Sequence, residues 1–257
     1  MPMEVRALVC TSCLLSLAAH ACHASDMRFD DLCALGETAT VQAALLDGAD
    51  GRRADERGAT PLHHVVRAGV DAPLSSHLEI VRILVEHGAD IDARDGSGRT
   101  PLGLALEKGH AFAGMTSLLL ELGARPDLSS AGAPPLCIAA ERGSIRQMEE
   151  LLERGADPDL RDDAGRPPLI AAIVGADPST ARARLLIDAG ADPNATCSLW
   201  GDEGVTPLMA AAVSAPPDVV ELLLSSGALS TLRSRSGMTA YDHAVRAGRE
   251  DGALLSR

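Results

Sequence analysis

His63 and His64 are adjacent residues that readily suggest chemistry, because paired imidazoles can bind a metal ion or transfer a proton. A metal site needs at least three protein ligands, and no third ligand follows this pair at a recognised spacing. On a helix, adjacent residues also point in different directions. The pair therefore predicts neither a metal site nor a catalytic site.

A second candidate cluster consists of Glu149, Glu150 and Glu153. These residues lie at helical spacing opposite apolar residues of the same segment, so we interpret them as a solvated helix face. The sequence has no Gly-x-Ser-x-Gly motif, no phosphate-binding loop and no Cys-x-x-Cys beyond residue 24. We therefore expect a protein that is not an enzyme, with no catalytic residues, no metal and no cofactor.

Cysteine usage adds no further chemistry. Beyond residue 24 the sequence contains Cys33, Cys137 and Cys197, which are odd in number and far apart. Such a set indicates no disulfide framework. Cys137 is expected to be a small buried side chain.

A short motif recurs along the chain and indicates which elements position these residues. In its fullest form it reads Gly-Ala-Thr-Pro-Leu-His, over residues 58–63. Its glycines are spaced 40, 34, 33, 39 and 33 residues apart. A period of about 33 residues predicts a solenoid in which some repeats carry extra loop residues. The motif glycines are Gly58, Gly98, Gly132, Gly165, Gly204 and Gly237.

The residue types of the motif explain how each repeat begins. Gly58 supplies the positive φ of a tight turn. Thr60 can cap a helix through its hydroxyl, and Pro61 fits the first helical position, where its missing N–H has no cost. A wide apolar stripe predicts a second helix over residues 77–87. Neither helix buries its apolar face alone, so neighbouring pairs must stack.

These motifs resemble those of the ankyrin-repeat family. An interleaved signal agrees, since Gly-Ala pairs begin at residues 48, 88, 123, 155, 190 and 227, where the second helices should end. The resemblance implies an all-α fold, an ankyrin-repeat solenoid of stacked helix pairs with short β-hairpin-like turns. It also implies that His63, the histidine of the motif, hydrogen-bonds locally. We predict an N-terminal capping repeat over residues 25–54, central repeats over 55–233 and a truncated C-terminal repeat over 234–257.

Residues 1–24 have the pattern of a secretory signal peptide. Arg6 precedes thirteen mostly apolar residues, and small residues follow at Ala21 and Ala24. Thirteen residues are too few for a membrane span, which needs about 20, and no later segment is a candidate. We therefore expect cleavage after Ala24 or Ala21 and a periplasmic or secreted protein without a membrane span.

The repeat spacings also place two insertions. One adds about seven residues near Val70 to Ser76, between the two helices of its repeat, and the other adds four around Cys197 to Glu203. The second insertion carries Trp200, the only tryptophan of the chain. A large aromatic residue in a lengthened surface loop suits a binding anchor. It could equally fold back over the adjacent helix.

Charge is expected to be distributed unevenly over the surface. The net charge of −13 and the aromatic content of 2% argue against nucleic-acid binding as a main role. The resemblance places partner contacts at the hairpin tips and first-helix ends, where eight basic residues accompany six acidic ones. We predict that a partner is bound on this concave surface by Arg57, Arg67, Arg99, Lys108, Arg142, Arg166, Trp200 and Arg246.

The resemblance implies a non-catalytic module that binds an unidentified protein partner. It is similar to exported, periplasmic ankyrin-repeat proteins of bacteria, and we expect a monomer. The alternative is a secreted ankyrin-type effector or toxin-associated protein that targets a host or competitor protein. Both alternatives use the same concave surface and differ in the partner and its location.

Overall fold

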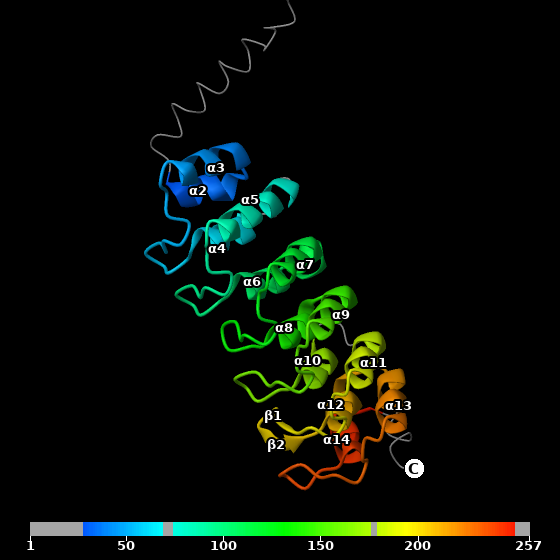
Figure 1. The fold of residues 1–257 in the computed structure, drawn as a ribbon. Helices are drawn as coiled ribbons and strands as arrows, with labels where there is room; N and C mark the ends of the chain where they lie inside the picture. The colour runs from blue at the N-terminus through cyan, green and yellow to red at the C-terminus, as the bar shows by residue number, and fades with distance from the viewer. Residues whose placement is uncertain (1–27, 69–73, 176–178, 250–257) are drawn as a thin grey trace, which may run out of the picture.

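The computed structural model describes residues 28–68, 74–175 and 179–249. The predicted signal peptide, the start of the capping repeat at 25–27, the insertion residues 70–73 and the end of the truncated repeat at 250–257 lie outside the described residues. Within the described part, helices stack as pairs in an elongated array, and the loops between pairs extend to one side (Figure 1). The all-α solenoid predicted from the sequence is confirmed.

Each pair consists of an inner helix next to the loops and an outer helix behind it (Figure 1). The inner helices contact one another in chain order, so they form a continuous layer. The inner helices are α2 (Phe29–Leu35), α4 (Pro61–Ala68), α6 (Pro101–Glu107), α8 (Pro135–Arg142), α10 (Pro168–Val174), α12 (Pro207–Ser214) and α14 (Ala240–Arg246). The outer helices are α3 (Thr38–Leu46), α5 (Leu74–Glu86), α7 (Ala113–Glu121), α9 (Ile145–Glu153), α11 (Thr180–Asp188) and α13 (Pro217–Ser225), and the 3-10 helix η1 (Gly109–Phe112) precedes α7.

Helices α6, α9, α12 and α14 begin where a side-chain cap satisfies a backbone N–H of the first turn. In α6, the Thr100 hydroxyl accepts a hydrogen bond from the Gly103 N–H at 3.1 Å. In α9, the Ser144 hydroxyl accepts from the Gln147 N–H at 3.3 Å, and the Gln147 side chain accepts from the Ser144 N–H at 3.0 Å. Such caps each contribute roughly 1 kcal/mol, so the Thr-Pro signal fixes the start of a helix locally.

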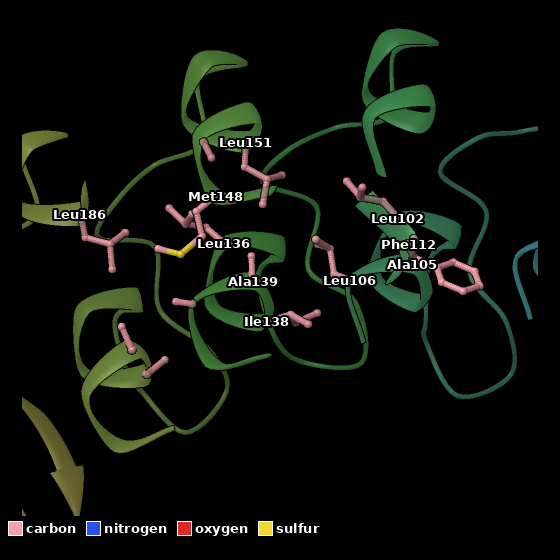
Figure 2. Close-up of a cluster of buried hydrophobic side chains, with 14 of the residues drawn as sticks. Leu102, Ala105, Leu106, Phe112, Leu136, Ile138, Ala139, Met148, Leu151 and Leu186 are labelled. Atoms are coloured by element: carbon pink, nitrogen blue, oxygen red, sulfur yellow. The ribbon is translucent and has the colours of Figure 1, made fainter. Parts of the chain in front are cut away.

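An apolar core runs along the array between the inner and outer helices. Figure 2 shows one section of it, in which side chains of α8 and α9 lie between those of α6 and α11. The leucine that follows Thr-Pro or Pro-Pro in the motif is at most 2% exposed in all five repeats that contain it. Because each leucine is covered partly by the next repeat, stacking supplies the burial that one helix pair lacks. These residues are Leu62, Leu102, Leu136, Leu169 and Leu208.

Backbone hydrogen bonds also join several loop tips to the loop of the neighbouring repeat. These bonds run from Gly96 N–H to Arg57 O at 2.8 Å, from Ala131 N–H to Gly98 O at 2.9 Å, from Asp163 N–H to Gly132 O at 2.8 Å and from Arg235 N–H to Glu203 O at 2.7 Å.

The first insertion is partly helical. Helix α5 has 13 residues, whereas the outer helix α9 has 9, so α5 is longer by about one turn. The bulge expected near Val70 to Ser76 is therefore replaced, from residue 74 onward, by helix. The rest of that bulge falls among residues 69–73, outside the described residues.

The second insertion forms the strands β1 (Cys197–Leu199) and β2 (Asp202–Val205), which pair antiparallel. Trp200 and Gly201 connect them, with φ angles of 53° and 80°. Two successive positive φ angles are typical of the two-residue turn that matches the twist of a hairpin. Trp200 thus lies in the turn of a hairpin and is 56% exposed, and its ring lies beside His243 of α14, with 6.5 Å between the ring centroids.

A candidate partner-binding surface

All eight residues predicted to bind a partner lie on the loops or at the inner helices. Arg57, Arg99 and Arg166 lie in loops, Arg67 lies in α4, and Arg142 and Arg246 are the last residues of α8 and α14. Lys108 directly follows α6, and Trp200 lies in the β1–β2 turn. None of them lies on an outer helix, so all eight belong to the layer of inner helices and loops.

Two of the predicted arginines are tied to one buried carboxylate. Arg67 Nη2 donates to Asp95 Oδ2 at 2.6 Å, and Arg99 Nε donates to the same oxygen at 3.0 Å. The side chain of Asp95 is only 2% exposed, and its other oxygen accepts the backbone N–H groups of Ser97 and Arg99. Burial raises the pKa of Asp95, but these donors and the Arg99 guanidinium outweigh it, so the pKa lies below its ordinary value.

Arg166 has the same arrangement two repeats later. Its Nε donates to Asp162 Oδ2 at 2.8 Å, and its Nη2 lies 3.6 Å from Glu141 Oε2. The Asp162 side chain is 5% exposed. The side chains of Arg67, Arg99 and Arg166 are each about 30% exposed. Their ion pairs with buried aspartates stabilise the loops. This role was not predicted from the sequence, and it leaves them less free to pair with a partner.

The remaining predicted basic residues extend into solvent. Arg57, Lys108, Arg142 and Arg246 are all exposed. Arg142 lies 3.5 Å from its neighbour Glu141, a contact in which the arginine side chain is 62% exposed. A surface contact of this kind is worth at most about 1 kcal/mol, so it competes weakly with an external partner. These four residues form the basic part of the accessible surface.

The two adjacent histidines have local structural partners. His63 is fully buried; its Nδ1 accepts from the Thr60 N–H at 3.1 Å, and its Nε2 donates to the Arg99 carbonyl at 2.9 Å. Burial lowers the pKa of His63, which keeps the imidazole neutral. The His64 Nε2 lies 3.0 Å from Asp55 Oδ2. The local hydrogen bonding expected of His63 is confirmed.

In the next repeat Gly103 replaces the motif histidine, and a serine takes over its function. Ser130 Oγ accepts the hydrogen bond of the Thr100 N–H at 3.0 Å, as His63 Nδ1 does for Thr60. The serine comes from the following loop and fills the space that a side chain at residue 103 would occupy. The hydrogen bond to Ser130 links two repeats, and the motif sequence does not predict it.

Cys137 occupies the same motif position in the repeat that begins at Gly132. It is buried, with its Sγ 3.4 Å from the Leu160 carbonyl oxygen, and burial raises the pKa of its thiol to about 12. A thiol with so high a pKa is unreactive at neutral pH. The small buried side chain expected here is confirmed.

The three glutamates of the candidate acidic cluster lie on the outer helix α9. Glu150 accepts from Ser117 Oγ at 2.7 Å, a contact that joins α7 to α9, and from Arg146 Nε of its own helix at 2.9 Å. Over the described residues, no group of three or more His, Cys, Asp or Glu side chains is arranged to hold a metal ion. No helix in that part of the chain is long and apolar enough to cross a membrane.

A cavity opens beside the β1–β2 hairpin, and we call it the Trp200 cavity. It has a volume of about 270 Å³. Two of the lining residues come from the hairpin. The others come from α12, from α14 and from the residue that follows α14. Sequence reasoning identified Trp200 and Arg246 but missed the cavity, because its walls come from two repeats. It is lined by Trp200, Asp202, Val213, His243, Arg246 and Ala247.

Comparison with known proteins agrees with this architecture. The family model described as "Ankyrin repeats (3 copies)" matches residues 31–130, 136–233 and 179–255. Ankyrin repeat and SOCS box protein 16 of Mus musculus is 34% identical over 213 residues, which are 80% of this chain and 43% of that protein. An ankyrin repeat protein of Rickettsia felis is 38% identical over 84 residues, which are 33% of this chain and 20% of the relative. The chain thus spans less than half the length of these relatives.

Among solved structures, the ankyrin repeat domain of human ASB11 is similar to this chain with a TM-score of 0.72 and 25% identity. The match covers 90% of this chain and 96% of that domain. Repeats of this kind are in general non-catalytic scaffolds for protein–protein interaction. The repeated motif, the stacked helix pairs and these matches together show that the chain belongs to the ankyrin-repeat family.

Proposed function

We propose that this protein is a non-catalytic interaction module that binds a partner protein on its concave loop and inner-helix surface. We further propose that it acts in the periplasm or is secreted. The observation that carries the proposal is the position of Arg57, Lys108, Arg142 and Arg246. These exposed basic side chains all lie on the loop side of a chain whose net charge is −13.

Exposed basic side chains on this surface favour a partner that presents an acidic or mixed-charge surface. Arginine is enriched at protein interfaces, and long-range attraction between opposite charges speeds association. Trp200 adds a large exposed apolar surface at the C-terminal half of the same side. Aromatic side chains with this exposure are common anchors of an interface.

Charge reversal on the loop side tests the proposed surface. The triple variant R57E/K108E/R142E changes only exposed positions, so we expect the melting temperature to change little. Capture of partner proteins by the immobilised chain should be lost. Arg99 and Arg166 are left unchanged, because a glutamate there would face a buried aspartate and destabilise the loops.

The matched control reverses three arginines of the outer helices, in R82E/R146E/R184E. Arg146 and Arg184 are exposed, and the side chain of Arg82 is 43% exposed. This control changes the net charge by the same amount on the opposite side of the array, and capture should persist. Loss of capture in the control alone would place the binding surface on the outer helices. Capture from a periplasmic extract supports the periplasmic module, whereas capture only from a host-cell lysate supports the secreted effector.

Export has its own test. The intact mass of the protein in the periplasmic fraction should correspond to a chain that begins at Ser25, or at Cys22 if cleavage follows Ala21. Full-length protein confined to the cytosol would contradict export, and it would leave the proposed binding surface untouched.

A further inference from the structure

The Trp200 cavity is lined by a buried histidine, His243, and a half-buried carboxylate, Asp202, which do not hydrogen-bond to one another. His243 is 6% exposed, and its Nε2 is buried without a hydrogen-bond partner among the described residues. The nearest carboxylate oxygen, Asp202 Oδ2, lies 3.8 Å away, which is too far for a hydrogen bond. A buried polar atom without a partner costs roughly 1–3 kcal/mol, so the site gains free energy when a partner arrives.

The protonation states of this pair define what can bridge it. Hydrogen bonds from the Ser234 and Ser236 hydroxyls lower the pKa of Asp202 to about 2, so its carboxylate is ionised and only accepts. Burial lowers the pKa of His243, so the imidazole is neutral at pH 7. The carboxylate opposite Nε2 favours the tautomer with the proton on that nitrogen. The cavity therefore offers one N–H donor and one carboxylate acceptor.

A hydroxyl group suits this pair. An oxygen about 2.8 Å from both Nε2 and Oδ2 spans the gap, accepting from His243 and donating to Asp202. A main-chain amide does not suit it, because its donor and acceptor are on different atoms. An ammonium group cannot accept from the histidine.

The walls of the cavity suit an aromatic body attached to that hydroxyl. Val213, Ala247 and the indole of Trp200 are apolar, and Arg246 at the rim can lie over the face of an aromatic ring. The volume of about 270 Å³ falls below the roughly 300–1,000 Å³ of sites for drug-sized ligands. It is the right size for one large side chain.

We propose that the Trp200 cavity receives a tyrosine side chain of the partner protein, with the phenolic oxygen between His243 Nε2 and Asp202 Oδ2. The inference rests on the proposed function, because a tyrosine in this position belongs to a protein on the concave surface. Nε2 has almost no accessible area, so side chains around it must shift as the tyrosine enters. The ring centroids of Trp200 and His243 are 6.5 Å apart, and Trp200 is 56% exposed, so its ring can shift with little loss of buried contact.

Nuclear magnetic resonance tests the proposal with two small probes, N-acetyl-tyrosine amide and N-acetyl-phenylalanine amide. The chain has one tryptophan, so its indole N–H gives a single resonance that reports on the cavity. The tyrosine amide should shift this resonance and the His243 ring nitrogens in a saturable way. The phenylalanine amide should bind at least about tenfold more weakly, because it leaves His243 Nε2 unpaired.

A matched pair of variants locates the binding site. V213F fills the cavity and should abolish the shifts caused by the tyrosine amide. V245F adds the same atoms to α14 at a position that is 55% exposed and does not line the cavity, and it should bind as the parent chain does. Equal binding of the two amides by the parent chain, or no saturable shift with either, would overturn the proposal even if V213F fails to fold.

These experiments distinguish failure of the tyrosine site from failure of the proposed partner-binding function. Partner capture that survives while the tyrosine amide causes no shift would reject the tyrosine site and keep the concave surface. A saturable tyrosine shift without partner capture by the parent chain would reject the proposed function instead.

Discussion

Replacing Gly103 by alanine should destabilise the protein, although the same change in most helix interiors is stabilising. An alanine Cβ at this position would lie 1.9 Å from Ser130 Oγ and 2.2 Å from Ser130 Cβ. A hydroxyl could rotate away, but Cβ is fixed to the backbone, so the loop itself must shift. Ser130 would then lose its hydrogen bond to the buried Thr100 N–H.

The size of the effect follows from three contributions. Overpacking a buried site costs about 1–3 kcal/mol, and the unpaired Thr100 amide costs a further 1–3 kcal/mol or so. Alanine gains about 1 kcal/mol over glycine in a helix. We expect the free energy of unfolding of Gly103→Ala to fall by about 3 kcal/mol, measured by urea denaturation followed by circular dichroism.

A double-mutant cycle makes the prediction specific. In Ser130→Gly both atoms that would clash are gone, and the Thr100 amide has already lost its partner. Adding Gly103→Ala to that variant should therefore raise its stability, by up to about 1 kcal/mol. A stabilising effect of Gly103→Ala in the parent chain, or the same loss in both backgrounds, would refute the reasoning.

Two further predictions concern buried charges and acid. Asp95→Asn leaves two arginines without their shared carboxylate, so it should lower the free energy of unfolding in urea by about 2 kcal/mol. Glu203→Gln removes one partner of an exposed ion pair and should lower it by less than about 1 kcal/mol. Burial depresses the pKa of His63 and of His243 in the folded protein, so the unfolded chain binds more protons below about pH 6.5, and stability should fall as the pH drops from 7.5 toward 5. Each of the variants His63→Gln and His243→Gln should flatten that pH profile, and an unchanged profile in both would contradict the assignment.

The sequence was sufficient for the fold because its signals act over a few residues. Thr100 caps the helix that it precedes, and the proline after it begins α6, so the motif predicts both the helix and its first residue. The apolar stripe predicted for residues 77–87 likewise marks most of α5. A period repeated along the chain then leaves little freedom in how the pairs stack.

The candidate site was less predictable because its contacts join residues far apart in the chain. Arg67 is 28 positions from the aspartate that holds it, and nothing around either residue distinguishes this arginine from the exposed Arg57. The replacement of the motif histidine by Ser130 spans 30 positions and depends on a glycine that leaves the space. Residue type identified which side chains could bind a partner, but only the packing shows which are free to do so.

The second insertion shows how such an array gains a site without losing stability. The tip-to-tip hydrogen bond from Arg235 N–H to Glu203 O is retained beyond the insertion, so the next repeat still stacks. The extra residues instead form a hairpin that brings Trp200 within 6.5 Å of the His243 ring, between ring centroids, in the following repeat. Because stability in a solenoid comes from contacts between neighbouring repeats, a loop extension adds surface at small cost. Trp200 from the inserted hairpin and His243 from the following repeat both line the cavity that we propose receives a partner side chain.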